Sequence, residues 1–175
     1  PEVTKVGNNT FKDCTNLCEV VLNKGLQKIG KYAFEGCTSL SSITLPSTLV
    51  EIDVSAFDNC SNLRKVVLNK GLVKIGPWAF ERCTSLESIV FPTTLREIHD
   101  YAFLGCKELR YIELNEGLQK IGWGAFESCR SLSSIEFPST LFNLGVCAFK
   151  DCNLKEIVLN EGLQQIREGT FRDNQ

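Results

Sequence analysis

The stretch CTSLESIVFPTTLREIHDYAF, from Cys83 to Phe103, is one turn of a pattern that runs through the whole 175-residue chain. Its most regular marker is a phenylalanine that recurs at six intervals of 23 residues and one of 22: Phe11, Phe34, Phe57, Phe80, Phe103, Phe126, Phe149 and Phe171. Self-similarity at such a period is the sequence signature of a solenoid, in which each repeat packs on its neighbours. The period therefore predicts the architecture before any single motif is considered.

Other positions keep the same phase. A cysteine stands three residues after seven of the phenylalanines: Cys14, Cys37, Cys60, Cys83, Cys106, Cys129 and Cys152. Leucine follows three residues later, except at Leu154, which arrives one residue early. Segments such as Ser88–Phe91 then alternate at period two in strand-favouring residues, so each unit, including the one around Val20, is predicted to hold a short strand. Leu and Ile three residues apart, such as Leu95 and Ile98, predict a second short strand after the turn.

The turn between the two strands alternates between two forms. Odd units carry Asn-Lys-Gly or Asn-Glu-Gly, as at 69–71, and even units carry Pro-Ser-Thr or Pro-Thr-Thr, as at 92–94. The alternation predicts a 46-residue super-repeat within one solenoid of seven repeats that spans residues 1–175. Solenoids need atypical capping repeats at their ends, and neither end resembles one. The chain is therefore predicted to be a fragment of a longer protein.

Composition and charge exclude several classes of partner. Hydrophobic residues make up 43% of the chain and charged residues 23%, which is ordinary for a folded soluble domain. The 19 Lys and Arg nearly balance the 21 Asp and Glu, so no general attraction to nucleic acid or anionic lipid is predicted. No apolar run approaches the ~20 residues needed to cross a bilayer, which predicts no direct membrane insertion.

The repeating unit A-F-x-x-C-x-x-L-x-x-I-x-L/F-P-x-x-L-x-x-I-G resembles the BspA-like class of leucine-rich repeats along essentially the whole chain. It departs from the more familiar leucine-rich pattern, since Leu26 stands nine residues after Leu17, where that pattern has Asn. The resemblance implies a mostly β leucine-rich-repeat solenoid of ~23-residue coils, each with a strand, a turn, a short second strand and a 3₁₀-like return turn, and no long helices. It also implies a role in recognition or adhesion and favours a cell-surface or secreted location. The family supplies no catalytic residue and no cofactor.

The cysteines and the single histidine are the residue types that could bind a metal or act in catalysis. A zinc site needs close cysteine pairs, and the only such pair is Cys14 and Cys18, so the seven in-phase cysteines are interpreted as small buried packing residues. Cys18 and Cys147 lie outside this column, and Cys147 is predicted to be the most accessible thiol. His99, beside Asp100, has the residue types of a general base, but it stands where other units have a loop glycine. We therefore predict no metal, no cofactor and no catalytic site.

Outward-facing positions are the candidates for partner binding. On the main strands these are Lys65, Val67, Val90, Tyr111, Glu113 and Glu136. Glu113 and Glu136 fall at equivalent positions of successive strands, where like charges destabilise a sheet, so their presence favours a function or a bound cation. The alternative is a solvated β face whose β-branched residues merely favour strands. A second candidate patch lies in the return loops: Trp78, Tyr101 and Trp123. Its alternative role is packing over the Ala-Phe turn.

Two functions fit these observations. The first is a non-catalytic recognition or adhesion module that binds a protein or glycan through an extended solenoid face. The alternative is a purely structural scaffold or spacer segment in a longer repeat array. An enzyme is not expected, because no nucleophile, base or phosphate-binding loop recurs in the required arrangement.

Overall fold

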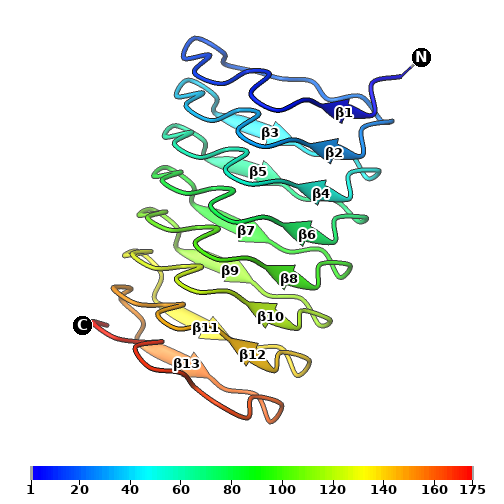
Figure 1. Cartoon of the computed structure of the whole chain (residues 1–175). Helices are drawn as coiled ribbons and strands as arrows, with labels where there is room; N and C mark the ends of the chain where they lie inside the picture. The colour runs from blue at the N-terminus through cyan, green and yellow to red at the C-terminus, as the bar shows by residue number, and fades with distance from the viewer. Residues whose placement is uncertain (1, 175) are drawn as a thin grey trace.

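The computed structural model describes residues 2–174 and is a stack of about seven coils, which runs in Figure 1 from the N-terminal coil at the top to the C-terminal coil at the bottom. Within these residues the regular structure consists of short parallel strands and no helix. One strand of each coil joins a continuous seven-stranded sheet: β1 (Lys5–Val6), β2 (Lys28–Ile29), β4 (Glu51–Ile52), β6 (Lys74–Ile75), β8 (Glu97–Ile98), β10 (Lys120–Ile121) and β12 (Asn143–Leu144).

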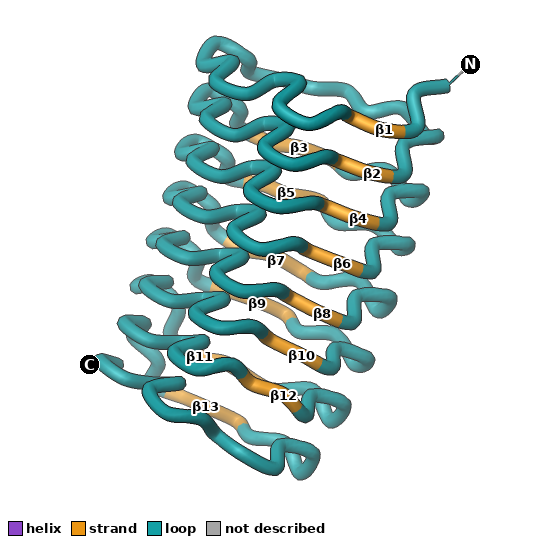
Figure 2. Tube along the Cα trace, viewed as in Figure 1, coloured by secondary structure: helices purple, strands orange, loops and turns teal. Residues whose placement is uncertain are grey.

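A second row of strands lies on the other side of the stack, and we call its outward surface the β3–β13 face (Figure 2). Its strands are β3 (Ser42–Thr44), β5 (Lys65–Val67), β7 (Ser88–Val90), β9 (Tyr111–Glu113), β11 (Ser134–Glu136) and β13 (Glu156–Val158). Most strands of the two rows pair with the strand 23 residues further on, as in Ile52↔Ile75, and β11 pairs with β13 at 22 residues. The predicted solenoid of ~23-residue coils is confirmed.

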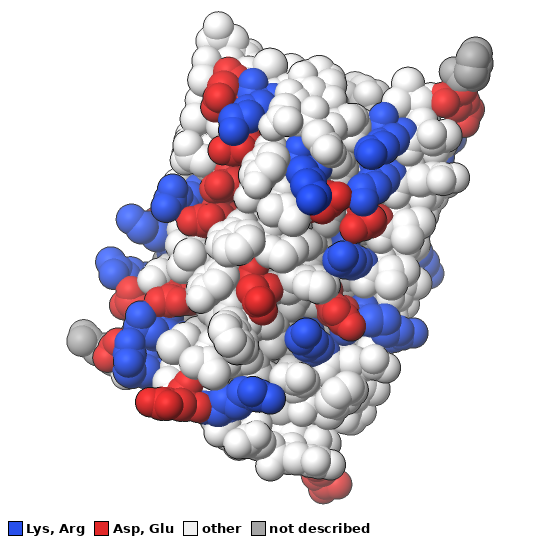
Figure 3. Space-filling view, in the orientation of Figure 1, with Lys and Arg blue, Asp and Glu red and all other residues white. Residues whose placement is uncertain are grey.

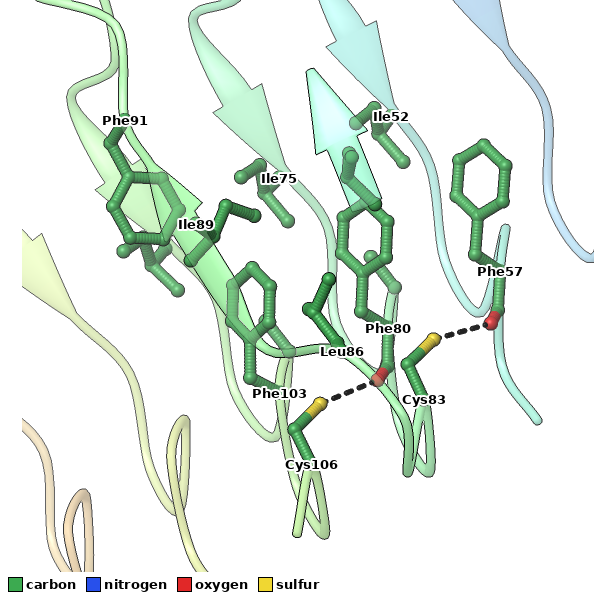
Figure 4. Packing of buried hydrophobic residues seen from close by; sticks show 14 of the residues in the cluster. Ile52, Phe57, Ile75, Phe80, Cys83, Leu86, Ile89, Phe91, Phe103 and Cys106 are labelled. Carbon is green, nitrogen blue, oxygen red and sulfur yellow. Dashed lines mark hydrogen bonds between the residues drawn. The ribbon is translucent and has the colours of Figure 1, made fainter. Parts of the chain in front are cut away.

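This register stacks identical side chains into columns, and the phenylalanines form the largest one (Figure 4). From Phe11 to Phe149 the ring centroids of successive coils lie 5.0 to 5.2 Å apart, close to the spacing of neighbouring strands. The last step, from Phe149 to Phe171, widens to 6.0 Å at the single 22-residue interval. Phe34 through Phe149 are fully buried in this column, which therefore forms the centre of the core.

The cysteine column contributes hydrogen bonds as well as volume. Each buried thiol donates to the carbonyl of the phenylalanine one coil earlier, as Cys83 does to Phe57 at 3.2 Å (Figure 4). Burial raises the pKa of the Cys83 thiol well above its usual value, and all nine cysteines are free. In the last coil Asn174 takes the cysteine position, and its amide donates to the Phe149 carbonyl at 2.9 Å. The packing role is therefore confirmed for the six buried members of the column.

Three predictions fail, two of them in the first coil. Cys14 is exposed although it belongs to the cysteine column, because no coil precedes it within the described residues. Cys14 and Cys18 are exposed whereas Cys147 is half-buried, so the prediction that Cys147 is the most accessible thiol is wrong. The strand predicted around Val20 is also absent. That segment has a neighbouring coil on one side only, and Val20 itself is no more than half-buried.

The two turn types hold each other in place through side-chain hydrogen bonds. In a Pro-type turn, the Thr94 hydroxyl donates to the Leu72 carbonyl at 2.8 Å and accepts from the Gly71 amide at 3.2 Å. In the next Asn-type turn, the Asn115 amide donates to the Leu95 carbonyl at 3.1 Å. Gly71 has a φ of 123°, and a Cβ there would collide with the Ser47 carbonyl. Each type of turn is thus held by hydrogen bonds to the coil that carries the other type.

The return arc consists of consecutive three-residue-spaced turns, such as Cys37 N–H to Phe34 carbonyl at 3.1 Å. These are the hydrogen bonds of a 3₁₀ turn. Residues in the left-handed region, among them Tyr32 at φ 56° and Gly36 at φ 72°, interrupt them and prevent a continuous 3₁₀-helix. The arc is therefore 3₁₀-like in its bonding but not helical.

Candidate functional site

The β3–β13 face is joined in pairs, unlike the continuous seven-stranded sheet. β3 with β5, β7 with β9, and β11 with β13 each align at three residue positions. Between the pairs the contact is weaker, since β5 and β7 share only the Lys65↔Ser88 position and β9 and β11 belong to different sheets. The breaks fall after an Asn-type coil and before a Pro-type coil. The face is therefore opened at alternate junctions.

Each of these two junctions forms a hollow on the surface. The β5/β7 slot, of about 570 Å³, is lined by Lys65, Val67, Lys70, Val90 and Glu113. The β9/β11 slot, of about 390 Å³, is lined by Tyr111, Glu113, Glu116, Glu136 and Glu156. The six candidate residues on the strands are thus brought together around two slots, and Glu113 lines both. Lys70 and Glu116 were missed because the strand pattern does not include the turn.

The side chains of the β9/β11 slot carry negative charge with little compensation. The Tyr111 hydroxyl donates to Glu113 Oε2 at 3.1 Å, and this hydrogen bond raises the pKa of Tyr111. Glu116 accepts from the Ser139 hydroxyl at 2.8 Å and so fixes one rim of the slot. Repulsion between the carboxylates of Glu113 and Glu136 is consistent with the loss of pairing between β9 and β11. In residues 2–174, no group of three or more His, Cys, Asp or Glu side chains is placed to hold a metal ion.

The outward surface of the seven-stranded sheet has a different arrangement of charges. Over β2 to β10, Lys and Glu alternate from strand to strand and lie side by side (Figure 3). Lys28 Nζ lies 2.7 Å from Glu51 Oε2 and 2.9 Å from Asp53 Oδ2, and Lys74 Nζ lies 3.5 Å from Glu51 Oε1. The hydrogen bond from Lys28 lowers the pKa of Glu51. The charges of Lys28, Glu51, Asp53 and Lys74 are therefore matched within the chain.

No such matching occurs in the two slots. Among the ion pairs of the described residues, none includes a charged member of either slot: Lys65, Lys70, Glu113, Glu116, Glu136 or Glu156. All six of these residues are exposed. Their charges are available to a partner, whereas Lys28, Glu51 and Lys74 of the seven-stranded sheet are already engaged in ion pairs.

The aromatic patch of the return loops is only partly assembled. Trp78 and Tyr101 stack with ring centroids 5.8 Å apart and an interplanar angle of 11°. Both occupy the left-handed region, at φ 54° and 57°, and the Tyr101 ring covers Gly124, the equivalent residue of the next coil. Trp123 is one residue out of phase and does not join this stack, so it stays 55% exposed while Trp78 is 38% exposed. The structure brings two of the three residues together.

Two titratable residues outside the slots, His99 and Asp58, have shifted pKa values. His99 Nε2 lies 3.3 Å from Glu97 Oε2, and burial lowers the pKa of His99. Asp58 follows Phe57 in the return arc, with Glu35 and Glu81 at the equivalent positions of the neighbouring coils. Burial, and then repulsion from Glu81 and Glu35, raise the pKa of Asp58 to about 6. The signal for this acidic run is present in the sequence, since the residue after the phenylalanine is acidic in three successive coils, at Glu35, Asp58 and Glu81.

The described part of the chain contains no helix of the length and apolar character that a membrane crossing requires. Among curated protein sequences none matches the chain. Solved structures do. A leucine-rich repeat protein from Bacteroides ovatus is 30% identical with a TM-score of 0.87, and the match covers 98% of this chain and 44% of that protein.

Two further solved structures are similar. A leucine-rich repeat protein of T. pallidum is 34% identical with a TM-score of 0.79, over 86% of this chain and 70% of its own. A leucine-rich cell surface protein of Faecalibacterium prausnitzii is 26% identical with a TM-score of 0.70, over 88% of this chain and 43% of its own. The chain therefore spans less than half the length of the Bacteroides and Faecalibacterium proteins.

The sequence profile described as BspA type leucine-rich repeat region matches six copies, over residues 1–110 and 96–175. Leucine-rich repeats are a class whose members act mainly in protein interaction and not in catalysis. Sequence profile, solved relatives and coil geometry agree: the chain belongs to the BspA-type leucine-rich repeat family.

Proposed function

We propose that this chain is a non-catalytic recognition module that binds a protein partner through the β3–β13 face. One observation carries the proposal: this face holds charged and apolar side chains around two open slots, without ion pairs inside the described chain. A charged group that lacks a partner contributes more to binding than one already paired, because no internal ion pair has to be broken. The slots also provide the exposed Tyr111 and Val90, and aromatic side chains are enriched at binding hot spots.

The broader setting of the proposal is adhesion or recognition at a cell surface, and it includes no chemical step, nucleic acid or membrane insertion. A glycan partner is the less favoured ligand. Stacking of a sugar needs an open aromatic face, and in the return loops Trp78 and Tyr101 each cover one face of the other, which leaves Trp123 as the most exposed ring there. The competing function, a rigid spacer, is favoured by the unbroken seven-stranded sheet and phenylalanine column.

A binding experiment separates recognition from spacing. A displayed library of random short peptides and a glycan array are probed with the native chain and with the double variant Tyr111→Ala, Glu113→Lys. The matched control is Tyr32→Ala, Glu168→Lys, which changes the same residue types at exposed positions outside the β3–β13 face. We expect peptide ligands that bind the native chain and the control but no longer bind the face variant. If ligands are absent, or are insensitive to the face variant, the recognition role is wrong and the spacer role is favoured.

A further inference from the structure

The charges of the β3–β13 face separate by sign along the solenoid axis. The second residue of the Asn-type turn is lysine in the N-terminal half, at Lys24 and Lys70, and glutamate in the C-terminal half, at Glu116 and Glu161. The strands follow the same division, with Lys65 on β5 and with Glu113, Glu136 and Glu156 on β9, β11 and β13. The exposed apolar Val90 lies in the middle of the face, and Val158 is exposed at its C-terminal end. The charges of the face are therefore bipolar about Val90.

A bipolar face of this kind is complementary to a copy of itself turned end to end. Two-fold interfaces require such self-complementarity, because each patch must meet the rotated image of the same surface. A two-fold axis that lies in the interface along β7 places the coil of β5 against the coil of β9 of the other copy. Evenly stacked coils then bring Lys70 opposite Glu116, Lys65 beside Glu113, and Val90 opposite Val90.

We propose that two copies of this chain associate antiparallel and face to face through their β3–β13 faces, with the two-fold axis along β7. The inference rests on the proposed function and identifies its protein partner as a second copy. In this arrangement the acidic β9/β11 slot of one copy receives Lys65 and Lys70 from the other, and the same contact occurs twice. One pair of like charges, Glu19 opposite Glu156, works against it.

The area of the β3–β13 face determines how strongly two copies can be expected to associate. Six strands at about 4.8 Å spacing, with a strand and turn of about six residues at 3.3 Å each, give about 600 Å² per copy. Stable interfaces bury about 800 Å² per partner, so the dimer lies at the weak end of specific association. Its attraction is electrostatic between exposed groups, and salt should therefore weaken it.

Sedimentation equilibrium of the 175-residue chain at low and high ionic strength tests the proposal. Three double variants are compared with the native chain. Lys65→Glu with Lys70→Glu leaves glutamate at all four paired positions of the interface, and Glu113→Lys with Glu116→Lys leaves lysine at all four. The control, Lys31→Glu with Lys107→Glu, makes the same charge change at exposed residues outside the face. Thermal melts followed by circular dichroism establish that each variant is folded.

We expect the native chain and the control to form a dimer at low salt, and each face variant alone to dimerise at least tenfold more weakly. An equimolar mixture of the two face variants should recover the native affinity, since every reversed charge then meets its opposite. A native chain that stays monomeric at low salt overturns the proposal, as does a mixture that shows no recovery. If the chain is monomeric but still binds peptides through the β3–β13 face, only the identification of the partner as a second copy is refuted. The recognition role then stays in place.

Discussion

Replacing Asp58 by asparagine should stabilise the fold at neutral pH and not in acid. Burial and the carboxylates of Glu81 and Glu35 raise the pKa of Asp58 from its ordinary value of 3.8 to about 6, while in the unfolded chain it stays near ~4. Below pH 4 Asp58 is protonated in both states and carries no penalty. As pH rises toward 6, the unfolded chain loses the proton first, so the folded state is progressively destabilised.

The gap between the two pKa values corresponds to about 3 kcal/mol, because each pKa unit is worth about 1.4 kcal/mol. Asp58 keeps some contact with water, so screening reduces the expected gain for Asp58→Asn to about 1–3 kcal/mol at pH 7.5. At pH 4 the two proteins should be about equally stable. Urea denaturation followed by circular dichroism at both pH values measures the difference.

Asp151→Asn is the matched control of opposite sign. Asp151 accepts from Arg130 at 2.8 Å, and this hydrogen bond lowers the pKa of Asp151. Its contribution to stability is present above the unfolded pKa and is lost as pH falls through the folded one, so the control should destabilise the chain at pH 7.5 and have less effect in acid. Equal effects of Asp58→Asn at pH 4 and pH 7.5, or a loss of stability at pH 7.5, would refute the explanation by burial and like charge.

Three further changes test the core, the thiols and the turns. Phe80→Ala should lower the free energy of unfolding by about 3–5 kcal/mol, because it empties the middle of a fully buried column; an unchanged melting temperature in calorimetry contradicts this role. Alkylation of the native chain followed by mass spectrometry should modify the exposed Cys14 and Cys18 well before the buried Cys83, and equal rates would show that the column is open. Thr94→Val removes the hydroxyl between Leu72 and Gly71 and should cost about 1–3 kcal/mol in urea denaturation, whereas Thr93→Val, at an exposed position, should cost little. If both substitutions cost the same, the alternation of turns does not depend on that hydroxyl.

The repeat predicts the fold well because the same environment recurs at each position of the coil. A phenylalanine every 23 residues can be satisfied by one buried column, and the rings indeed stack at 5.0 to 5.2 Å along most of the chain. Phase alone says nothing of how many neighbours a coil has. It therefore placed Cys14 in the core, although the first coil has no predecessor within the described residues, and it overrated the exposure of Cys147, which is half-buried.

The candidate site could be predicted only in part. Alternation along the strands identifies Lys65, Val67 and Glu113 as outward residues, and the structure confirms that Lys65 and Glu113 are exposed and that Val67 is half-buried. The slots depend on which junctions between coils are paired, and that depends on turn geometry and hydrogen bonds that cross from one coil to the next. Lys70 and Glu116, which sit in those turns, could not be assigned to the slots from the strand pattern.

The seven-stranded sheet and the β3–β13 face have the same spacing between coils, yet they distribute charge in opposite ways. On the seven-stranded sheet, lysine and glutamate alternate from β2 to β10, and Lys28 bridges both Glu51 and Asp53. On the β3–β13 face, glutamates gather at β9, β11 and β13 without a cation among them in the β9/β11 slot. Such clustering is unfavourable in the isolated chain, and alternation, the remedy, is present on the opposite side of the same coils. Opposite charge supplied by a partner would offset this cost, so the segregated face is the one on which a partner has the most to contribute.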